Sequence, residues 1–266
     1  HVARAPAQPQ MASNRGGRQL SFADLPSLGR RGTLLSRTPI DRLDMERWEL
    51  GNGVTALVRN TNIEPNKIRI RVRWGGGRQA VAAQGGNLLW AGDIALVESG
   101  VAQLDQSQLE RLVNGRQIGM AFDVDDDAFE LSAETRPEDL ADQLRLLATK
   151  LAAPGWQASP IQRARAGRLV SYDLLRATPM AVVENELQGL LYSGDRRFTP
   201  PTRAEVEALT PRNFRAFWEP LMRQGPIEVQ IFGDVASVDL EGMLLNTFGA
   251  MPRRPAVRAV AADVQP

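Results

Sequence analysis

Residues 45–59 read MERWELGNGVTALVR, two runs of alternating apolar and polar residues on either side of Gly51-Asn52-Gly53. An Asn-Gly pair between alternating runs is the strongest short-range signal for a β-hairpin. The stretch Ile68–Trp74 repeats the alternation, with Ile, Val and Trp on one face and arginines on the other. These stretches predict a sheet with one buried face and one solvated face.

Helical patterns dominate the rest of the chain. We expect helices over 87–97 and 104–113, then two strands over 118–124 and 128–133 around an acidic turn. Capping sequences predict where later helices begin. Such starts are expected at Thr135, Thr202 and Thr210. Two further helices fit 159–177 and 179–192, and a strand at 227–232 and a helix at 238–248 are also expected. Strands grouped early and helices grouped late predict an α+β fold, a two-layer sandwich with a mostly antiparallel sheet covered by helices.

The two ends of the chain lack this periodicity. Residues 1–43 are rich in Ala, Pro, Gln, Arg and Gly, and we expect a linker or disordered lead-in, with compact structure from about Asp44. Within them, the apolar residues of Leu20–Leu28 could dock on a surface. Residues 44–252 are expected to form a single domain, and 253–266 a tail or linker. A first residue other than Met suggests a tag remnant or an excised fragment.

The composition excludes several classes of function. The 266 residues carry 32 basic and 31 acidic side chains, so the net charge of +1 provides no field for nucleic acid or an anionic membrane. The absence of cysteine excludes disulfides and thiolate chemistry. No apolar run reaches 18 residues, so no membrane span is expected. The N-terminus also lacks the apolar stretch of a signal peptide.

The sequence offers few metal ligands. The stretch Asp123–Asp127 with Glu134 has the carboxylate spacing of an EF-hand loop, but Ala128 stands where that loop requires glycine. The flanking residues alternate, so we predict a solvated turn between two strands. His1 is the only histidine. Neither a zinc site nor a Ser-His-Asp triad is therefore expected.

Other reactive groups also lack a supporting pattern. Lys67 and Lys150 are the only lysines, and neither lies near a serine in a motif for Ser-Lys chemistry. The turn at Gly75-Gly76-Gly77 lacks the spacing that cradles phosphate. Glu184 and Glu186 lie two apart on an expected helix, so they do not share a face. We expect no catalytic residue and no metal ligand in this chain.

The arginine face of the first long strand, formed by Arg69, Arg71 and Arg73, has two interpretations. It could bind an acidic partner, or it could be an ordinary solvated strand face, which is the expected state. The sequence identifies no substrate-binding residue.

Several segments, taken in order, resemble domains of the pitrilysin-type (insulinase-like) zinc metallopeptidases. The resemblance runs from about residue 45 to 254. Its segments are Trp48–Val54, the strand ending at Gly75–Gly77, Pro137–Leu140 with Pro154-Gly155, Leu191–Phe198 with Pro201-Thr202, and Ile231–Asp234 with Thr247–Arg254.

Active domains of that family carry an inverted zinc motif, His-x-x-Glu-His, on the first long helix, and a more distant glutamate completes the site. The corresponding helix here contains Leu89–Ile94, and the distant glutamate falls near Val170-Ser171. Every ligand of the family pattern is missing. The resemblance therefore implies an inactive domain with a fold of the mitochondrial-processing-peptidase type.

The resemblance also implies a role. Such a domain would help to form a substrate-enclosing chamber and make domain–domain contacts, while a zinc site in another domain or subunit hydrolyses peptide. This chain alone is expected to be inactive and to hold no cofactor. Its expected partners are other domains of the same peptidase, or a subunit with the zinc motif, and peptide substrate, but not nucleic acid. The resemblance favours a bacterial periplasm and leaves the cytoplasm open.

Two other functions stay open from the sequence. The chain could be a scaffold with no peptidase activity in any partner, as in respiratory-complex relatives of the family. It could also be an independent binding module for a small ligand. A His-x-x-Glu-His motif in the same or a neighbouring coding sequence would favour the peptidase role.

Overall fold

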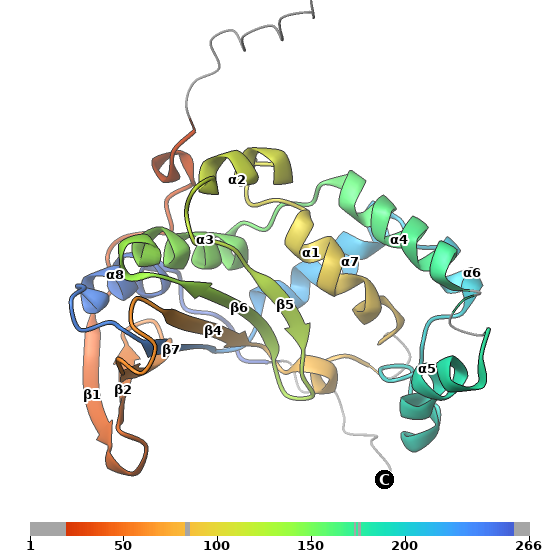
Figure 1. The fold of residues 1–266 in the computed structure, drawn as a ribbon, viewed down its shortest axis with the longest axis horizontal. Helices are drawn as coiled ribbons and strands as arrows, with labels where there is room; N and C mark the ends of the chain where they lie inside the picture. Colours follow the sequence, from red (N-terminus) through yellow and green to blue (C-terminus); the bar gives the residue numbers. More distant parts are fainter. Residues whose placement is uncertain (1–19, 83–85, 173, 175–176, 258–266) are drawn as a thin grey trace, which may run out of the picture.

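The computed structural model describes residues 20–82, 86–172, 174 and 177–257. In these ranges seven strands form one sheet in the order β1-β2-β3-β7-β4-β6-β5 (Figure 1). Strands β3 and β7 run parallel, and the other neighbouring pairs are antiparallel. The strands are β1 (Leu34–Ile40), β2 (Met45–Leu50), β3 (Thr55–Asn60), β4 (Ile68–Trp74), β5 (Ala121–Val124), β6 (Phe129–Thr135) and β7 (Ile227–Gly233).

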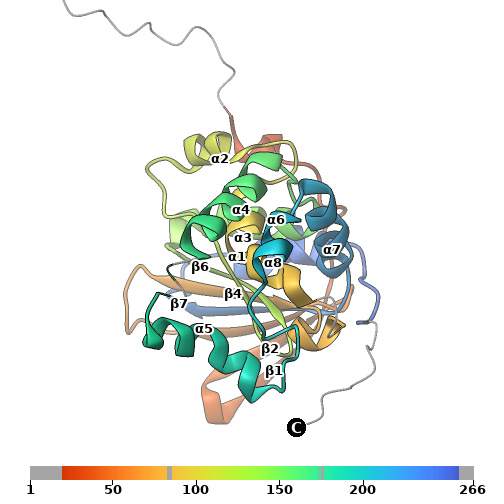
Figure 2. The same ribbon diagram turned by 90° about the vertical axis from the view of Figure 1, so that its right-hand side faces the viewer.

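Most of the helices cover one face of this sheet (Figure 2). They are α1 (Gly92–Glu98), α2 (Gln106–Val113), α3 (Leu140–Ala152), α4 (Ala158–Tyr172), α5 (Pro179–Leu191), α6 (Arg203–Glu207), α7 (Pro211–Arg223) and α8 (Leu240–Asn246). The predicted α+β sandwich with a mostly antiparallel sheet is confirmed. In the described ranges, the helices are too short or too polar to span a bilayer.

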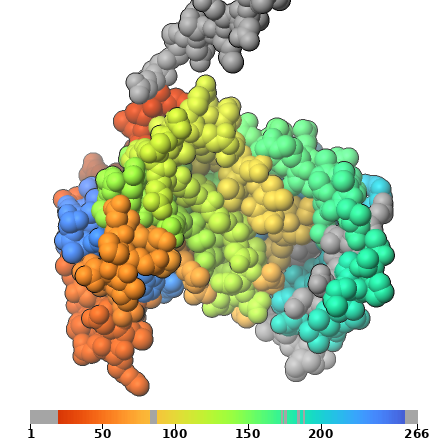
Figure 3. Space-filling view, in the orientation of Figure 1, coloured from red at the N-terminus to blue at the C-terminus, as the bar shows by residue number. Residues whose placement is uncertain are grey.

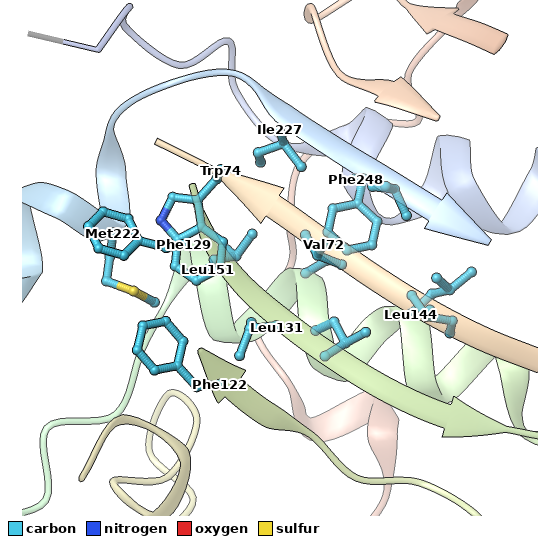
Figure 4. Packing of buried hydrophobic residues seen from close by; sticks show 14 of the residues in the cluster. Val72, Trp74, Phe122, Phe129, Leu131, Leu144, Leu151, Met222, Ile227 and Phe248 are labelled. Atoms are coloured by element: carbon cyan, nitrogen blue, oxygen red, sulfur yellow. The ribbon is translucent and has the colours of Figure 1, made fainter. Parts of the chain in front are cut away.

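The core lies between the sheet and these helices. On β4 the apolar side chains of Ile68, Ile70, Val72 and Trp74 are buried, while the alternating arginines point to the other face. Figure 4 shows Val72 and Trp74 among side chains from neighbouring strands and from helix α3. Burial of one face of each strand is what gives the sequence its period of two.

The predicted hairpin at Asn52 is present between β2 and β3. Gly53 has a φ of 89°, a conformation that glycine adopts without steric cost. The Asn52 side chain does more than shape the turn. Its Nδ2 donates to the carbonyl oxygens of Phe248, at 2.8 Å, and Met251, at 2.9 Å. The hairpin thereby holds the end of the last helical segment against the sheet.

The expected start of the compact region was wrong. We expected it near Asp44, but β1 (Leu34–Ile40) already pairs with β2. Residues Leu25 and Leu28 are buried upstream of this strand, which confirms that Leu20–Leu28 docks. Strand β1 escapes a pattern search because it is an edge strand with mostly exposed side chains, so its sequence has no period of two.

Two expected helix starts also differ from the structure. The helix expected over 87–97 begins as a 3-10 segment, η4 (Gly86–Ala91), and becomes α-helical at Gly92. Thr135 does not cap a helix, because it is the last residue of β6 and pairs with Ile68 of β4. Its hydroxyl is buried without a hydrogen-bond partner. A 3-10 turn, η5 (Pro137–Asp139), then leads into α3. The capping box predicted at Thr202 and the helix cap predicted at Thr210 are both confirmed.

Candidate functional site

The sequence resemblance aligns Leu89–Ile94 with the family's zinc motif, and this stretch lies in η4 and α1, beside α4. Aromatic side chains fill the space next to it. A Cβ on Gly92 would lie 2.5 Å from Cζ2 of Trp218 and 2.9 Å from Cε1 of Phe122. The two rings pack edge to face with their centroids 5.4 Å apart. Only glycine leaves room for this packing at residue 92, so no ligand-bearing side chain fits there.

The residues around this position do not fit a zinc ion. Structural and catalytic zinc sites take their ligands from Cys, His and carboxylate side chains. Asp93 is the single candidate in the stretch 89–94, and Val170 and Ser171 on α4 supply no carboxylate. Across the residues that the structure describes, no cluster of three His, Cys, Asp or Glu side chains is placed to hold a metal.

The acidic stretch Asp123–Asp127 is a turn between β5 and β6, as predicted. The N–H of Asp125 donates to the carbonyl oxygen of Ala128, at 2.9 Å, and closes the turn. The carboxylates separate instead of converging on a cation. Asp127 pairs with Arg73, at 2.8 Å, and Asp126 pairs with Arg78, at 3.7 Å. The turn is therefore held by arginines.

The glycines at 75–77 are structural. Gly75 and Gly77 have φ values of 70° and 53°, in the left-handed region. Backbone atoms of the acidic turn lie against Gly77, so a Cβ there would collide with the carbonyl oxygen of Asp125. The N–H groups of Arg78 and Gln79 donate to the carbonyl oxygens of Asp125 and Asp126, each at 3.0 Å. The predicted turn after β4 is confirmed, and it packs against the acidic turn between β5 and β6.

On the arginine face of β4, neighbouring glutamates balance the charges of Arg69 and Arg71. Arg69 pairs with Glu64, and Arg71 lies 3.3 Å from Glu130 on the neighbouring strand. Burial raises the pKa of the Glu130 carboxyl. A hollow of about 460 Å³ opens on this face, lined by Arg69, Arg71, Gly119, Met120, Ala121, Ser132 and Glu134, among others. The face combines charged pairs with a small apolar depression.

Lys150 is the one candidate that the structure places differently from expectation. It lies beside a serine after all, with Nζ 3.3 Å from Oγ of Ser99. Its ammonium also donates to the carbonyl oxygens of Gly100, at 2.7 Å, and Leu96. Side-chain exposure decides against catalysis, because Lys150 is 1% exposed and Ser99 is fully buried. No substrate can reach this pair in the folded chain.

The surroundings of Lys150 give it a structural role. Leu96 belongs to the last turn of α1, where carbonyl oxygens lack helical donors and the helix dipole favours a cation. Lys150 on α3 therefore closes the end of α1 and ties the two helices together. Burial lowers the pKa of the amine to about 7. Sequence reasoning missed this contact, because 51 residues separate the two side chains along the chain.

A second buried charge, Asp139, was also missed. Its carboxylate accepts hydrogen bonds from Arg116 Nε, at 2.7 Å, Arg136 Nε, at 2.6 Å, and the N–H of Gln117, at 2.9 Å. Burial alone would raise its pKa, but the hydrogen bonds from Gln117, Arg116 and Arg136 outweigh burial and lower the pKa to about 2. The carboxylate has no room for a further ligand, and it fixes the loop before β5 to the start of α3.

The remaining acidic candidates, Glu184 and Glu186, both lie on α5. None of the sequence candidates therefore assembles into a reactive site within the residues described. What remains distinctive is the fold itself, with aromatic packing at the stretch that the resemblance aligns with the family's zinc motif.

Comparison with known proteins identifies this fold. No family model matches the chain. Its sequence is 25% identical over 209 residues to the chloroplastic stromal processing peptidase of Pisum sativum, covering 76% of this chain and 16% of that protein. It is 27% identical over 130 residues to the probable zinc protease PqqL of Haemophilus influenzae, covering 49% and 14%. The chain thus spans about one sixth of the length of these relatives.

Solved structures of peptidases also resemble this chain. The periplasmic protease PqqL from Escherichia coli matches with a TM-score of 0.79 and 18% identity, over 96% of this chain and 28% of that one. The inactive domain of an M16 peptidase from Pseudomonas fluorescens matches with a TM-score of 0.63 and 18% identity, over 81% of this chain and 53% of that one. The resemblance to pitrilysin-type peptidases is confirmed, and the chain has the fold shared by their domains, inactive ones included.

Proposed function

We propose that this chain acts as a non-catalytic domain of a zinc-dependent peptidase. It helps to enclose the peptide substrate and contacts other domains, while zinc-activated water hydrolyses the peptide in another domain or subunit. One observation carries the proposal. The chain has the fold of a peptidase domain, but in the stretch that the resemblance aligns with the metal-binding helix, Gly92 packs against the rings of Trp218 and Phe122. A domain that has a complete hydrophobic core but no reactive groups would contribute through its shape and through its contacts with substrate and with other domains.

The polar face of the sheet is the surface that we assign to the chamber wall. Extended peptides often add to a free sheet edge, but both edges here are blunted. On β5 the N–H of Val124 donates to its neighbour Asp123, at 2.7 Å, and its carbonyl oxygen accepts from Arg78. On β1, Pro39 has no N–H to offer. The exposed face with Arg69 and Arg71 is therefore favoured over either edge.

The test is charge reversal in the intact enzyme that contains this domain. Arg69→Glu with Arg71→Glu replaces two exposed cations, and we expect peptide hydrolysis to slow severalfold while the zinc content stays unchanged. Confinement of the substrate contributes to catalysis independently of the metal. The rate of hydrolysis can therefore fall while the zinc content does not change. Arg215→Glu, on the exposed side of α7, is the matched control and should leave turnover unaltered.

Two outcomes would contradict the proposal. Normal turnover after deletion of the whole domain would exclude a role in the chamber. A parent protein without any zinc or hydrolysis would instead point to a scaffold. The first outcome would make the chamber role wrong and the second would make the peptidase role wrong, while the fold would stand in both.

A further inference from the structure

A groove opens beside the edge strand β1, on the face of the sheet that most of the helices cover. It lies between β1, β2, β3 and the start of α8, and its volume is about 750 Å³. We name it the α8 groove. Trp48 and Val58 line it and belong to the hydrophobic core, so it lies on the opposite side of the sheet from the exposed Arg69 and Arg71. Figures 1 and 3 show β1 and β2 at one end of the molecule, next to α8.

The α8 groove combines apolar side chains with negative charge. Val58 and Leu240 are buried in it, and Met45 and Val238 are half-buried. Five carboxylates line the groove, against the single guanidinium of Arg37. They belong to Asp41, Asp44, Glu46, Asp239 and Glu241. The whole chain has a net charge of +1, so this is a local concentration of negative charge, and such a concentration attracts cations.

Arg37 shows how the groove holds a cation. Its guanidinium lies 4.0 Å from the centre of the Trp48 ring and pairs with Glu241. The indole Nε1 of Trp48 in turn donates to Glu46, at 2.7 Å. An aromatic face next to a carboxylate is a favourable place for a guanidinium. The chain's own arginine therefore neutralises one of the five carboxylates.

The other four carboxylates pair with no Arg or Lys side chain in the part of the chain that the structure describes. Asp239 accepts from the N–H of Gly242, at 2.9 Å, and so caps α8. Glu46 accepts from the Trp48 indole. The side chains of Asp41 and Asp44 are exposed and have no hydrogen-bond partner among the described residues. The groove thus keeps uncompensated negative charge beside an apolar floor.

These features select the kind of occupant. A metal ion does not fit, because nowhere in the described ranges do three carboxylates come together to hold one. Nucleic acid and anionic membranes are repelled, since both are bound through basic side chains. An extended polypeptide fits, because its side chains alternate, so that basic ones can reach the acidic rim while apolar ones cover the floor.

We propose that the α8 groove binds an extended basic segment of another domain of the parent protein. Arg or Lys side chains of that segment pair with Asp41, Asp44 and Asp239, and its apolar side chains cover Val58 and Leu240. The choice of a domain over substrate rests on the proposed function, which assigns substrate to the opposite side of the sheet. The groove's preference for a basic polypeptide does not depend on that function.

Calorimetric titration of the 266-residue chain with a capped peptide of four Arg-Val repeats tests the groove. We expect a Kd of roughly 10–100 µM at low salt, weakening as salt screens the charges. Asp41→Asn with Asp44→Asn should raise the Kd about tenfold. Asn tolerates the φ of 51° at residue 44, so the turn should keep its shape. Glu49→Gln with Glu110→Gln removes two exposed carboxylates outside the groove and should bind like the parent chain.

The intact enzyme that contains this domain tests the source of the occupant. Its own basic segment should already fill the groove, so the Arg-Val peptide should bind there at least about tenfold more weakly than to the 266-residue chain. Equal binding to both would show that no other domain fills the groove. Equal binding of a Glu-Val peptide, no binding of the Arg-Val peptide, or an unchanged Kd in the double Asn variant would also overturn the proposal. None of these results depends on turnover, so the proposal and the chamber role fail separately.

Discussion

Nζ of Lys150 lies 2.7 Å from the carbonyl oxygen of Gly100. This contact joins the last turn of α3, a helix with many buried side chains, to the loop that follows α1. It is an ammonium without a carboxylate partner in the described surroundings, held by backbone carbonyl oxygens and by Ser99 Oγ. Burial of such a cation is costly unless hydrogen bonds compensate for the lost water. The stability of the chain should therefore depend on the protonation of one side chain.

We expect the free energy of unfolding to rise with pH between about 7 and 10.5. Burial lowers the pKa of Lys150 to about 7, from 10.5 in an unfolded chain. In this window the unfolded state binds a proton that the folded state releases, so folding gains as pH rises. The gain is at most about 5 kcal/mol. Lys150→Met should remove this pH dependence in urea titrations at several pH values.

Lys67 provides the control for this prediction. Hydrogen bonds to Glu64 and Glu134 raise the pKa of Lys67, so this lysine contributes no stability gain over the same window. Lys67→Met should leave the alkaline rise intact. A rise that persists in Lys150→Met would show that another group causes it.

The packing at Gly92 predicts a strongly destabilising substitution. Gly92→Ala adds a Cβ 2.5 Å from the indole of Trp218, and overpacking of a dense core costs about 1–3 kcal/mol. Gly167→Ala on α4 is the matched control, because nothing lies within 4 Å of its new Cβ. That substitution should stabilise by about 0.5–1 kcal/mol. Thermal unfolding of both variants measures the difference, and equal effects would refute the aromatic filling of this site.

Asp139 should govern acid stability. Its pKa of about 2 lies below the usual 3.8, so it stabilises the fold above pH 4 and loses this effect as pH falls toward 2. Asp139→Asn should cost about 2 kcal/mol at pH 7 and flatten the acid limb of the stability curve. Glu138→Gln, which changes an exposed partner of Arg136, should have little effect. Comparable losses in both variants would assign the stabilisation to surface charge instead.

The acidic turn should not respond to calcium. Its carboxylates are already paired with arginines, and Ala128 stands where a calcium loop needs glycine. Millimolar calcium should leave the melting temperature of the chain unchanged. A calcium-dependent rise that disappears in Asp125→Ala would show that the turn binds the ion.

Much of the sheet could be predicted from the sequence, because β2, β3 and β4 each bury one face and so carry a period of two. The hairpin at Asn52 and the helix caps at Thr202 and Thr210 were also predictable, because turns and caps depend on residues that are close together in the sequence. Strand β1 was not, since an edge strand that buries little leaves no pattern. Thr135 resembles a helix cap in sequence, but pairing with β4 determines its conformation.

The internal charges could not be predicted at all. Lys150 and Ser99, or Asp139 and Arg116, meet only through the tertiary fold. The sequence does show that it offers no cysteine and no histidine other than His1 as zinc ligands. It could not show why residue 92 must be glycine, which depends on the approach of Trp218 and Phe122.

Zinc stoichiometry tests the central claim most directly. The tag-free chain, freed of His1, would be equilibrated with excess zinc, passed over a desalting column and measured by elemental analysis. We predict far less than one zinc per chain, since its residues do not fit the ion and Trp218 occupies the space beside Gly92. One zinc per chain, retained together with peptide hydrolysis, would contradict the account of a non-catalytic domain.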